Sequence, residues 1–193
     1  MFDLLFKSMQ GHVTLSQEEM EFCKTLFIPK KLRKKQYFLQ EGDVCRHTAF
    51  VEKGILRTFV TGEKGNEPIL QFSMEGWWAA DLYSFFTREP SPYNVEALED
   101  CELLLITQYS WDILLEKVPA LERYFRILIQ NNLITTQRRL IGAMSETAEE
   151  KYLKLLKNFP GSVQRVPQHM IASYLGITPE TLSRIRGQLA SKK

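Results

Sequence analysis

The sequence predicts an α+β protein in which an N-terminal antiparallel β jelly roll is followed by one long helix and a C-terminal helix-turn-helix. Three observations support this fold class. Between residues 36 and 107, short apolar segments alternate with glycine-bearing turns. After Trp111, apolar residues recur at spacings of three and four, which is typical of helices. Near the end of the chain, two short amphipathic segments flank Gly176.

The composition is that of an ordinary folded protein and excludes several other classes. Of 193 residues, 44% are hydrophobic and 25% are charged, which excludes intrinsic disorder and collagen-like repeats. No stretch approaches the roughly 18 uninterrupted apolar residues of a membrane span. The first ten residues lack the pattern of a secretory signal. We therefore expect a cytoplasmic protein with no membrane partner.

Three units are expected along the chain. We expect residues 1–118 to form the β domain with its packed helices, residues 119–145 the long helix, and residues 146–193 the helix-turn-helix unit. Near the N-terminus, Ser16 stands before two glutamates and predicts the N-cap of a helix. The basic run at 30–35 is interpreted as a solvated edge of the domain, with a nucleic-acid contact as the alternative.

The β domain is predicted from five short segments, which are YFLQ, TAFVE, ILRTFV, PILQFSM and CELLLIT. Glycine-bearing turns separate them, which is typical of an antiparallel barrel or jelly roll. The turn glycines that we expect to adopt positive φ are Gly42, Gly54, Gly62, Gly65 and Gly76. A further strand is predicted for SVQRV at 162–166.

The segment after Pro119 predicts a helix that is too long for a domain of this size to cover. Apolar residues recur at helical spacing near both of its ends, whereas its middle is polar. Docking on its own β domain is one outcome, and pairing with a second copy as a coiled coil is the outcome we favour. The sequence therefore predicts a homodimer through residues 119–145.

The most informative segment is PQHMIASYLGITPETLSRIRGQL at 167–189. Gly176 can end a first helix, and Thr178 followed by Pro179 is typical of the start of a second one. The second helix turns Leu182 inward and polar side chains outward, which is the helix-turn-helix pattern. Arg can donate two hydrogen bonds to guanine, Glu can accept from cytosine, and Ser or Thr can bond phosphates. The predicted DNA-binding residues are Thr178, Pro179, Glu180, Thr181, Ser183, Arg184 and Arg186.

The charge distribution also favours a polyanion at this end of the chain. Residues 164–193 carry five basic side chains and one acidic side chain, whereas the rest of the chain carries 20 basic and 22 acidic ones. A small basic unit on a nearly neutral body is typical of a protein that binds a polyanion.

A jelly roll, a long helix and a C-terminal helix-turn-helix together resemble the Crp/Fnr family of bacterial transcription regulators, over nearly the whole chain. The resemblance implies a cyclic-nucleotide-binding-like effector domain, a homodimer, and double-stranded DNA and RNA polymerase as partners. The recognition helix of that family resembles S-R-E-T-V-x-R, which Glu180 and Arg184 match, whereas Pro179 replaces the first base-reading arginine. We therefore expect a different operator. The family's β wing is expected to be reduced or absent, because four residues follow Leu189.

The resemblance also implies where an effector would bind. Cyclic-nucleotide-binding members hold the ribose with a Gly-Glu-Leu helix start and the phosphate with an Arg-Ser or Arg-Thr pair. Here Asp81-Leu82 replaces Glu-Leu, and Ser91-Pro92 replaces Arg-Ser. Without that arginine a buried phosphate is uncompensated, so a cyclic nucleotide is not favoured; another effector or none is the alternative. The candidate effector-pocket residues are Gly76, Ala80, Asp81, Leu82, Arg88, Ser91, Pro92 and Thr136.

Neither enzyme activity nor a metal or cofactor site is expected. His12, His47 and His169 are scattered, and no H-x-H, P-loop or G-x-S-x-G motif is present. The three cysteines form no C-x-x-C pair. The sequence thus predicts a bacterial regulator that reads a palindromic site as a homodimer through the helix at 179–189. The alternative is a ligand-binding or interaction module that no longer binds DNA specifically.

Overall fold

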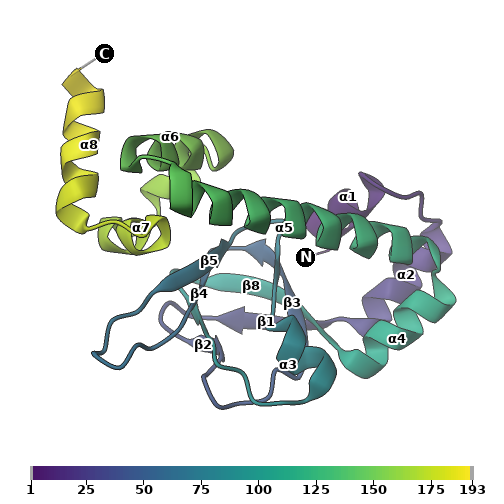
Figure 1. Ribbon diagram of the computed structural model, residues 1–193. Helices are drawn as coiled ribbons and strands as arrows, with labels where there is room; N and C mark the ends of the chain where they lie inside the picture. Colours follow the sequence, from purple (N-terminus) through teal and green to yellow (C-terminus); the bar gives the residue numbers. More distant parts are fainter. Residues whose placement is uncertain (1, 192–193) are drawn as a thin grey trace.

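Figure 1 shows the computed structural model, which describes residues 2–191. The long helix α5 (Ala120–Ser145) lies along a β sandwich, and α6, α7 and α8 gather at the C-terminal end of α5. The other α-helices are α1 (Asp3–Gln10), α2 (Gln17–Leu26), α3 (Leu82–Thr87), α4 (Gln108–Lys117), α6 (Ala148–Asn158), α7 (Gln168–Leu175) and α8 (Pro179–Ser191). The strands are β1 (Ile28–Leu32), β2 (Tyr37–Leu39), β3 (His47–Lys53), β4 (Leu56–Phe59), β5 (Ile69–Ser73), β6 (Trp78–Ala79), β7 (Asn94–Ala97) and β8 (Cys101–Thr107).

Two four-stranded antiparallel sheets form the sandwich. One sheet has the order β1-β8-β3-β6 and the other the order β2-β7-β4-β5. The inward side chains of both sheets, such as Phe50, Leu56 and Val95, are buried in one core because alternate residues of a strand point to the same face. The predicted α+β class is therefore confirmed, with an antiparallel β domain followed by the long helix and the C-terminal helices.

Three strands lack a sequence signal and were not among the predicted segments. β1 lies at the edge of its sheet, and four of its five side chains are exposed, so it shows no apolar alternation. Its lysines are typical of an edge strand that is protected from further pairing. The interpretation of the basic run as a solvated edge is consistent with this position. β6 has only two residues, and all four residues of β7 are buried, so neither strand shows an apolar alternation.

Capping stabilises α2 at its start, and one buried tyrosine ties α1 to the sandwich. Ser16 caps α2 as predicted, accepting from the N–H of Glu19 at 3.1 Å while the Glu19 carboxylate accepts from the N–H of Ser16. Tyr124 of α5 is fully buried, and its hydroxyl lies 2.9 Å from the Ser8 hydroxyl and accepts from Trp78 Nε1 at 3.1 Å. These two bonds join α1, β6 and α5.

Only the first part of α5 is covered by the sandwich. Leu121, Tyr124 and Phe125 are buried, whereas every residue from 129 to 138 is exposed. The exposed apolar side chains on this helix are Ile129, Leu133, Ile134, Leu140, Ile141 and Met144.

Two local predictions were wrong. The SVQRV segment contains a short 3-10 helix (Ser162–Gln164) instead of a strand, and Val163 and Val166 are both buried because a spacing of three places them on one side of a helical turn. Gly62 does not adopt positive φ, whereas Gly42, Gly54, Gly65 and Gly76 do. That loop turns at Gly65, whose N–H bonds to the carbonyl of Gly62 at 2.8 Å.

A second hydrophobic core joins the C-terminal helices to the outer face of the sandwich. It contains Ile55, Phe59 and Phe72 from the β domain together with Leu155 and Ile171 from α6 and α7. The two parts of the chain are therefore packed against each other. Among the described residues, no helix has the length and apolar character needed to cross a bilayer.

Candidate functional site

The turn between α7 and α8 is built by three local features that the sequence predicted. Gly176 ends α7 in the left-handed region with φ of 67°, and Ile177 then donates its N–H to the Ala172 carbonyl at 3.0 Å. The Thr178 hydroxyl accepts from the N–H of Thr181 at 3.2 Å and caps α8. Pro179 occupies the first helical position, where its missing N–H costs nothing.

The two faces of α8 differ as a DNA-reading helix requires. Leu182 and Ile185 are buried in the second core, with 1% and 5% of their surface exposed. On the outer face Glu180, Ser183, Arg184 and Arg186 are exposed, together with Thr178 and Pro179 at the start of the helix. Thr181 is half-buried, and its hydroxyl lies 3.2 Å from that of the capping Thr178.

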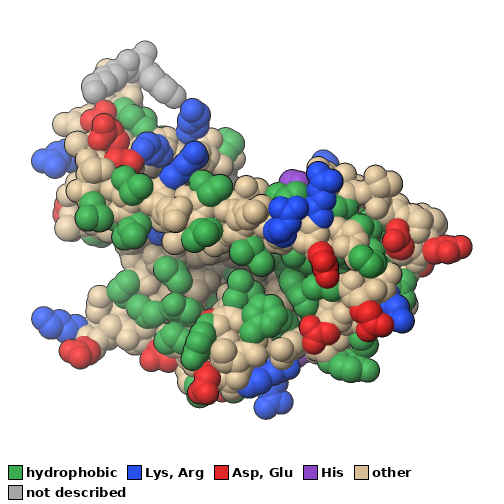
Figure 2. Space-filling view, turned by 45° about the vertical axis from the view of Figure 1, so that its right-hand side comes forward, with side chains coloured by type: hydrophobic (Ala, Val, Ile, Leu, Met, Phe, Trp, Pro, Cys, Tyr) green, Lys and Arg blue, Asp and Glu red, His purple; other side chains and the backbone are tan. Residues whose placement is uncertain are grey.

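The charged groups of α8 remain available to a ligand. Within residues 2–191, neither Arg184 nor Arg186 makes a hydrogen bond or an ion pair. Hydrogen bonds from its own backbone N–H and from the Thr178 hydroxyl hold the pKa of Glu180 below its ordinary value. In Figure 2, several Lys and Arg side chains lie on the visible face of this lobe, beside acidic ones. Residues 146–191, which end with α8, contain no β-strand.

The structure brings two of the predicted effector residues into direct contact. Asp81 is buried and caps α3 by accepting from the N–H of Ser84 at 3.3 Å. Its second oxygen accepts from the hydroxyl of Ser91, which is also buried, at 2.8 Å. The Ser84 hydroxyl accepts from the N–H of Cys45 and donates to the carbonyl of Glu89. The polar groups of this site are therefore bonded to one another.

The other predicted effector residues do not converge on that pair. Arg88 is exposed and ends α3 in the left-handed region with φ of 66°. Gly76 adopts φ of 83° and bonds its N–H to the Val51 carbonyl. Thr136 is exposed on the part of α5 that the sandwich leaves uncovered. Of the remaining three, Leu82 and Pro92 are exposed and Ala80 is half-buried.

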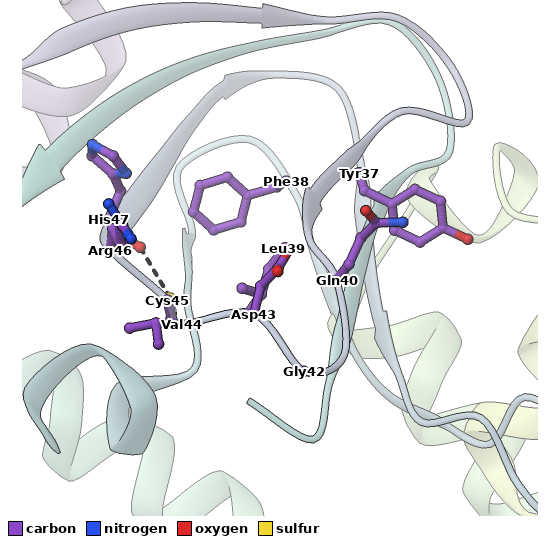
Figure 3. Close-up of a pocket in the computed structure, with 10 residues that line it drawn as sticks. All are labelled: Tyr37, Phe38, Leu39, Gln40, Gly42, Asp43, Val44, Cys45, Arg46 and His47. Atoms are coloured by element: carbon purple, nitrogen blue, oxygen red, sulfur yellow. Dashed lines mark hydrogen bonds between the residues drawn. The ribbon is translucent and has the colours of Figure 1, made fainter. Parts of the chain in front are cut away.

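A cavity of about 590 Å³ lies beside this site, in a stretch where the sequence predicted a strand and a turn at Gly42 but no effector residue. Its wall is formed by residues 37–47 apart from Glu41, and Figure 3 shows Phe38 near its centre with Arg46 and His47 at one end. Burial, together with the charges of Arg46 and Arg88, lowers the pKa of His47. Burial raises the pKa of the Cys45 thiol, so this cysteine is a small apolar residue here.

Comparison with known proteins agrees with this architecture. A family model described as the cyclic nucleotide-binding domain matches residues 29–117. The fumarate and nitrate reduction regulatory protein of Vibrio cholerae is 26% identical over 91% of this chain and 74% of its own length. Regulatory protein HlyX of Actinobacillus pleuropneumoniae is 27% identical over 91% of this chain and 77% of its own length.

The fold is also shared with a solved structure. The c-di-GMP responsive global regulator CLP of Xanthomonas campestris superposes with a TM-score of 0.73 at 14% identity, covering 92% of this chain and 93% of that one. These relatives are transcription regulators and not enzymes. Residues 29–117 match the cyclic nucleotide-binding domain, and about nine-tenths of the chain is similar to regulators of the Crp/Fnr family, which bind DNA as dimers.

Proposed function

We propose that this chain is a cytoplasmic homodimeric regulator that reads a palindromic DNA site through α8. The observation that carries the proposal is the outer face of α8, where Arg184 and Arg186 are exposed and have no partner within the described residues. The proposed units are an effector domain at 1–118, a dimerisation helix at 119–145 and a DNA-binding unit at 146–193. RNA polymerase is the further partner that we propose.

Each exposed residue of the helix is given a role by its chemistry. Arg184 donates to guanine and Glu180 accepts from cytosine in the major groove. Arg186 bonds to phosphate, which positions the helix without specifying sequence. The polar residues that hold the backbone or flanking bases are Thr178, Thr181 and Ser183. Pro179 cannot donate to a base, so the first position of the family's reading pattern is unused here.

The exposed stripe of α5 supports pairing with a second copy. Ile129, Leu133, Leu140 and Met144 recur at spacings of four, seven and four, and each is between 55% and 83% exposed. An apolar seam at this spacing is buried when two helices coil around each other. The dimer then places two copies of α8 about 34 Å apart, which matches successive major grooves on one side of the duplex.

We propose that the effector site has lost cyclic nucleotide binding. The Asp81 carboxylate lies where the ribose-binding glutamate would be expected, and it is already satisfied by Ser91 and by the N–H of Ser84. Ser91 itself stands where the phosphate-binding arginine would be expected. A second anion in this buried site would be repelled and left without a cation, because Arg88 is exposed in the solvent. A different effector or none is therefore proposed.

A gel-shift experiment tests the DNA-binding proposal. Palindromes selected from random DNA by the full chain are titrated with the natural sequence, with Arg184→Ala and with Lys157→Ala as a matched control that removes an exposed charge from α6. We expect Arg184→Ala to lose about 1–3 kcal/mol of binding and to relax specificity, as for one bidentate base contact. If Arg184→Ala binds the palindromes as tightly as the natural sequence does, the alternative function is supported, namely an interaction module that does not bind DNA specifically.

A further inference from the structure

The DNA-binding unit is packed on its own β domain by a broad apolar surface. The Phe72 ring of β5 lies 5.2 Å from the Tyr174 ring of α7, and the Trp77 ring lies 5.5 Å from the Phe159 ring that follows α6. The surrounding second core is shared by both parts of the chain. This packing gives the interface its affinity, but apolar contacts alone do not fix its orientation.

Arg165 fixes that orientation with a forked contact to two glutamates of the β domain. Its Nη1 and Nη2 donate to the two oxygens of Glu75 at 3.2 and 2.7 Å. Its Nε and Nη2 donate to the two oxygens of Glu99. Glu75 is itself held because it accepts from the N–H of Gly54 at 2.9 Å. A planar guanidinium bonded to two carboxylates is directional in a way that a single ammonium is not.

A second polar contact holds the other side of the interface. Ser173 of α7 donates its hydroxyl to the carbonyl of Glu67 at 3.0 Å and accepts from the N–H of Ile69 at 3.1 Å. The Glu67 carboxylate pairs with Arg57 at 2.5 Å, and this buried arginine also pairs with Glu96 at 2.6 Å. The β4–β5 loop is therefore fixed on both its sheet side and its α7 side.

The long helix takes part in the same network. Arg139 of α5 lies over the Tyr174 ring at 4.2 Å from its centre and donates to the Leu70 carbonyl at 2.7 Å. Sheet, long helix and α7 are therefore tied at one place. A dimer formed through α5 would transmit this fixed arrangement to both copies of α8.

We propose that Arg165 is a positioning residue for operator recognition, and that its contact with Glu75 and Glu99 sets the half-site spacing that the dimer accepts. The inference rests on the proposed function. Without the Arg165 contact, the unit would keep its apolar packing and the Ser173 and Arg139 contacts, but it could rock on the outer sheet face and accept several spacings. A unit pinned to its own β domain presents α8 in one direction, so a palindrome with another spacing can be engaged by only one protomer at a time.

Operators of altered spacing test this inference. The probe is a palindrome selected by the natural protein, with two or four base pairs added to or removed from its centre, and a single half-site is measured in parallel. We expect the natural protein to bind the altered spacings about 100-fold more weakly, because the second contact is lost. Arg165→Ala is expected to bring the selected and altered spacings within about threefold of each other on the same grounds, with half-site binding unchanged.

Glu99→Gln separates positioning from a direct contact of Arg165 with DNA. Glu99 belongs to the β domain. Among the described residues, Arg165 is the one side chain that donates hydrogen bonds to its carboxylate. We expect it to relax the spacing preference as Arg165→Ala does, and Lys157→Ala to leave the preference unchanged. Thermal unfolding of each variant verifies that it is folded.

The outcomes distinguish the inference from the proposed function. An unchanged spacing preference in both Arg165→Ala and Glu99→Gln, with half-site binding retained, overturns the positioning role alone. Relaxed spacing in Arg165→Ala but not in Glu99→Gln also overturns it, in favour of a phosphate contact by Arg165. If no palindrome is selected, or if Arg184→Ala selects the same one with equal affinity, the DNA-binding proposal itself fails.

Discussion

The hydroxyl of Ser91 donates to the carboxylate of Asp81 across 2.8 Å, and both side chains are buried. Ser91 lies ten residues after Asp81 in the sequence. The sequence predicted each of them as an effector-pocket residue but did not predict a bond between them. The contact satisfies one carboxylate oxygen, while the N–H of Ser84 satisfies the other.

The first prediction concerns the stability of this pair. Ser91→Ala removes the donor and leaves a buried carboxylate oxygen without its partner, so we expect the free energy of unfolding to fall by about 1–3 kcal/mol. Urea denaturation followed by circular dichroism measures the change. Ser110→Ala serves as the control, because Ser110 is only partly buried at the start of α4. A Ser91→Ala variant as stable as the natural protein would contradict the assignment.

The second prediction concerns cyclic AMP. Because Asp81 repels a phosphate and no buried cation compensates it, calorimetry is expected to detect no binding tighter than about millimolar, which corresponds to roughly 4 kcal/mol. Micromolar binding would show that the site rearranges to accept a nucleotide. Arg88→Ala would then reveal whether the exposed arginine moves in to supply the charge.

The third prediction concerns the pH dependence of the Arg165 contact. Burial raises the pKa of Glu75, but hydrogen bonds from Arg165 and from the N–H of Gly54 outweigh it and hold the pKa below its ordinary value of 4.5. The folded state therefore binds this proton less readily than the unfolded state does. The resulting stability is present above pH 4.5 and is lost as the pH falls through the lower folded pKa.

Glu75→Gln tests that pH dependence. The amide oxygen still accepts from Gly54 but carries no charge for Arg165. At pH 7 we expect the natural protein to be more stable than Glu75→Gln by no more than about 1 kcal/mol, since the pair is partly exposed. The difference should shrink below pH 4.5. A gap that stays constant down to pH 3 would argue against an ionised Glu75.

The fourth prediction concerns the dimer. Leu133 is 56% exposed on α5, so Leu133→Lys should leave the folded protomer intact while placing a charge in the proposed seam. Sedimentation at micromolar concentration is expected to show a monomer. Asn131→Lys is the matched control, because it lies about 200° around the helix from Ile129 and should leave the dimer intact. A Leu133→Lys dimer would place the interface elsewhere.

The sequence predicted the elements whose signals are local. The strands rich in branched and aromatic residues were found from their spacing, and the helical hairpin was found from Gly176 and Thr178, because a turn and a cap are determined by neighbouring residues. The strand prediction for the SVQRV segment was wrong for a related reason. Five residues with two valines fit a strand as well as a helical turn, and the second core decides between them.

The contacts between distant parts of the chain could not be predicted in this way. Arg165 lies 66 residues from Glu99 and 90 residues from Glu75, and nothing in the local pattern of any of the three indicates the others. The charge count included Arg165 in the basic C-terminal unit that was expected to favour a polyanion. The structure instead commits Arg165 to the β domain and leaves Arg184 and Arg186 on the surface.

The second core has a consequence for anyone who recombines regulators of this kind. Its apolar side chains come in matched halves, with Ile55 and Phe59 on the sandwich and Leu155 and Ile171 on the helices. Transferring α6 to α8 onto the β domain of another regulator would therefore expose both halves of this core to water. The DNA-binding unit cannot be transferred by itself, and a working chimaera must include the outer sheet face on which it packs.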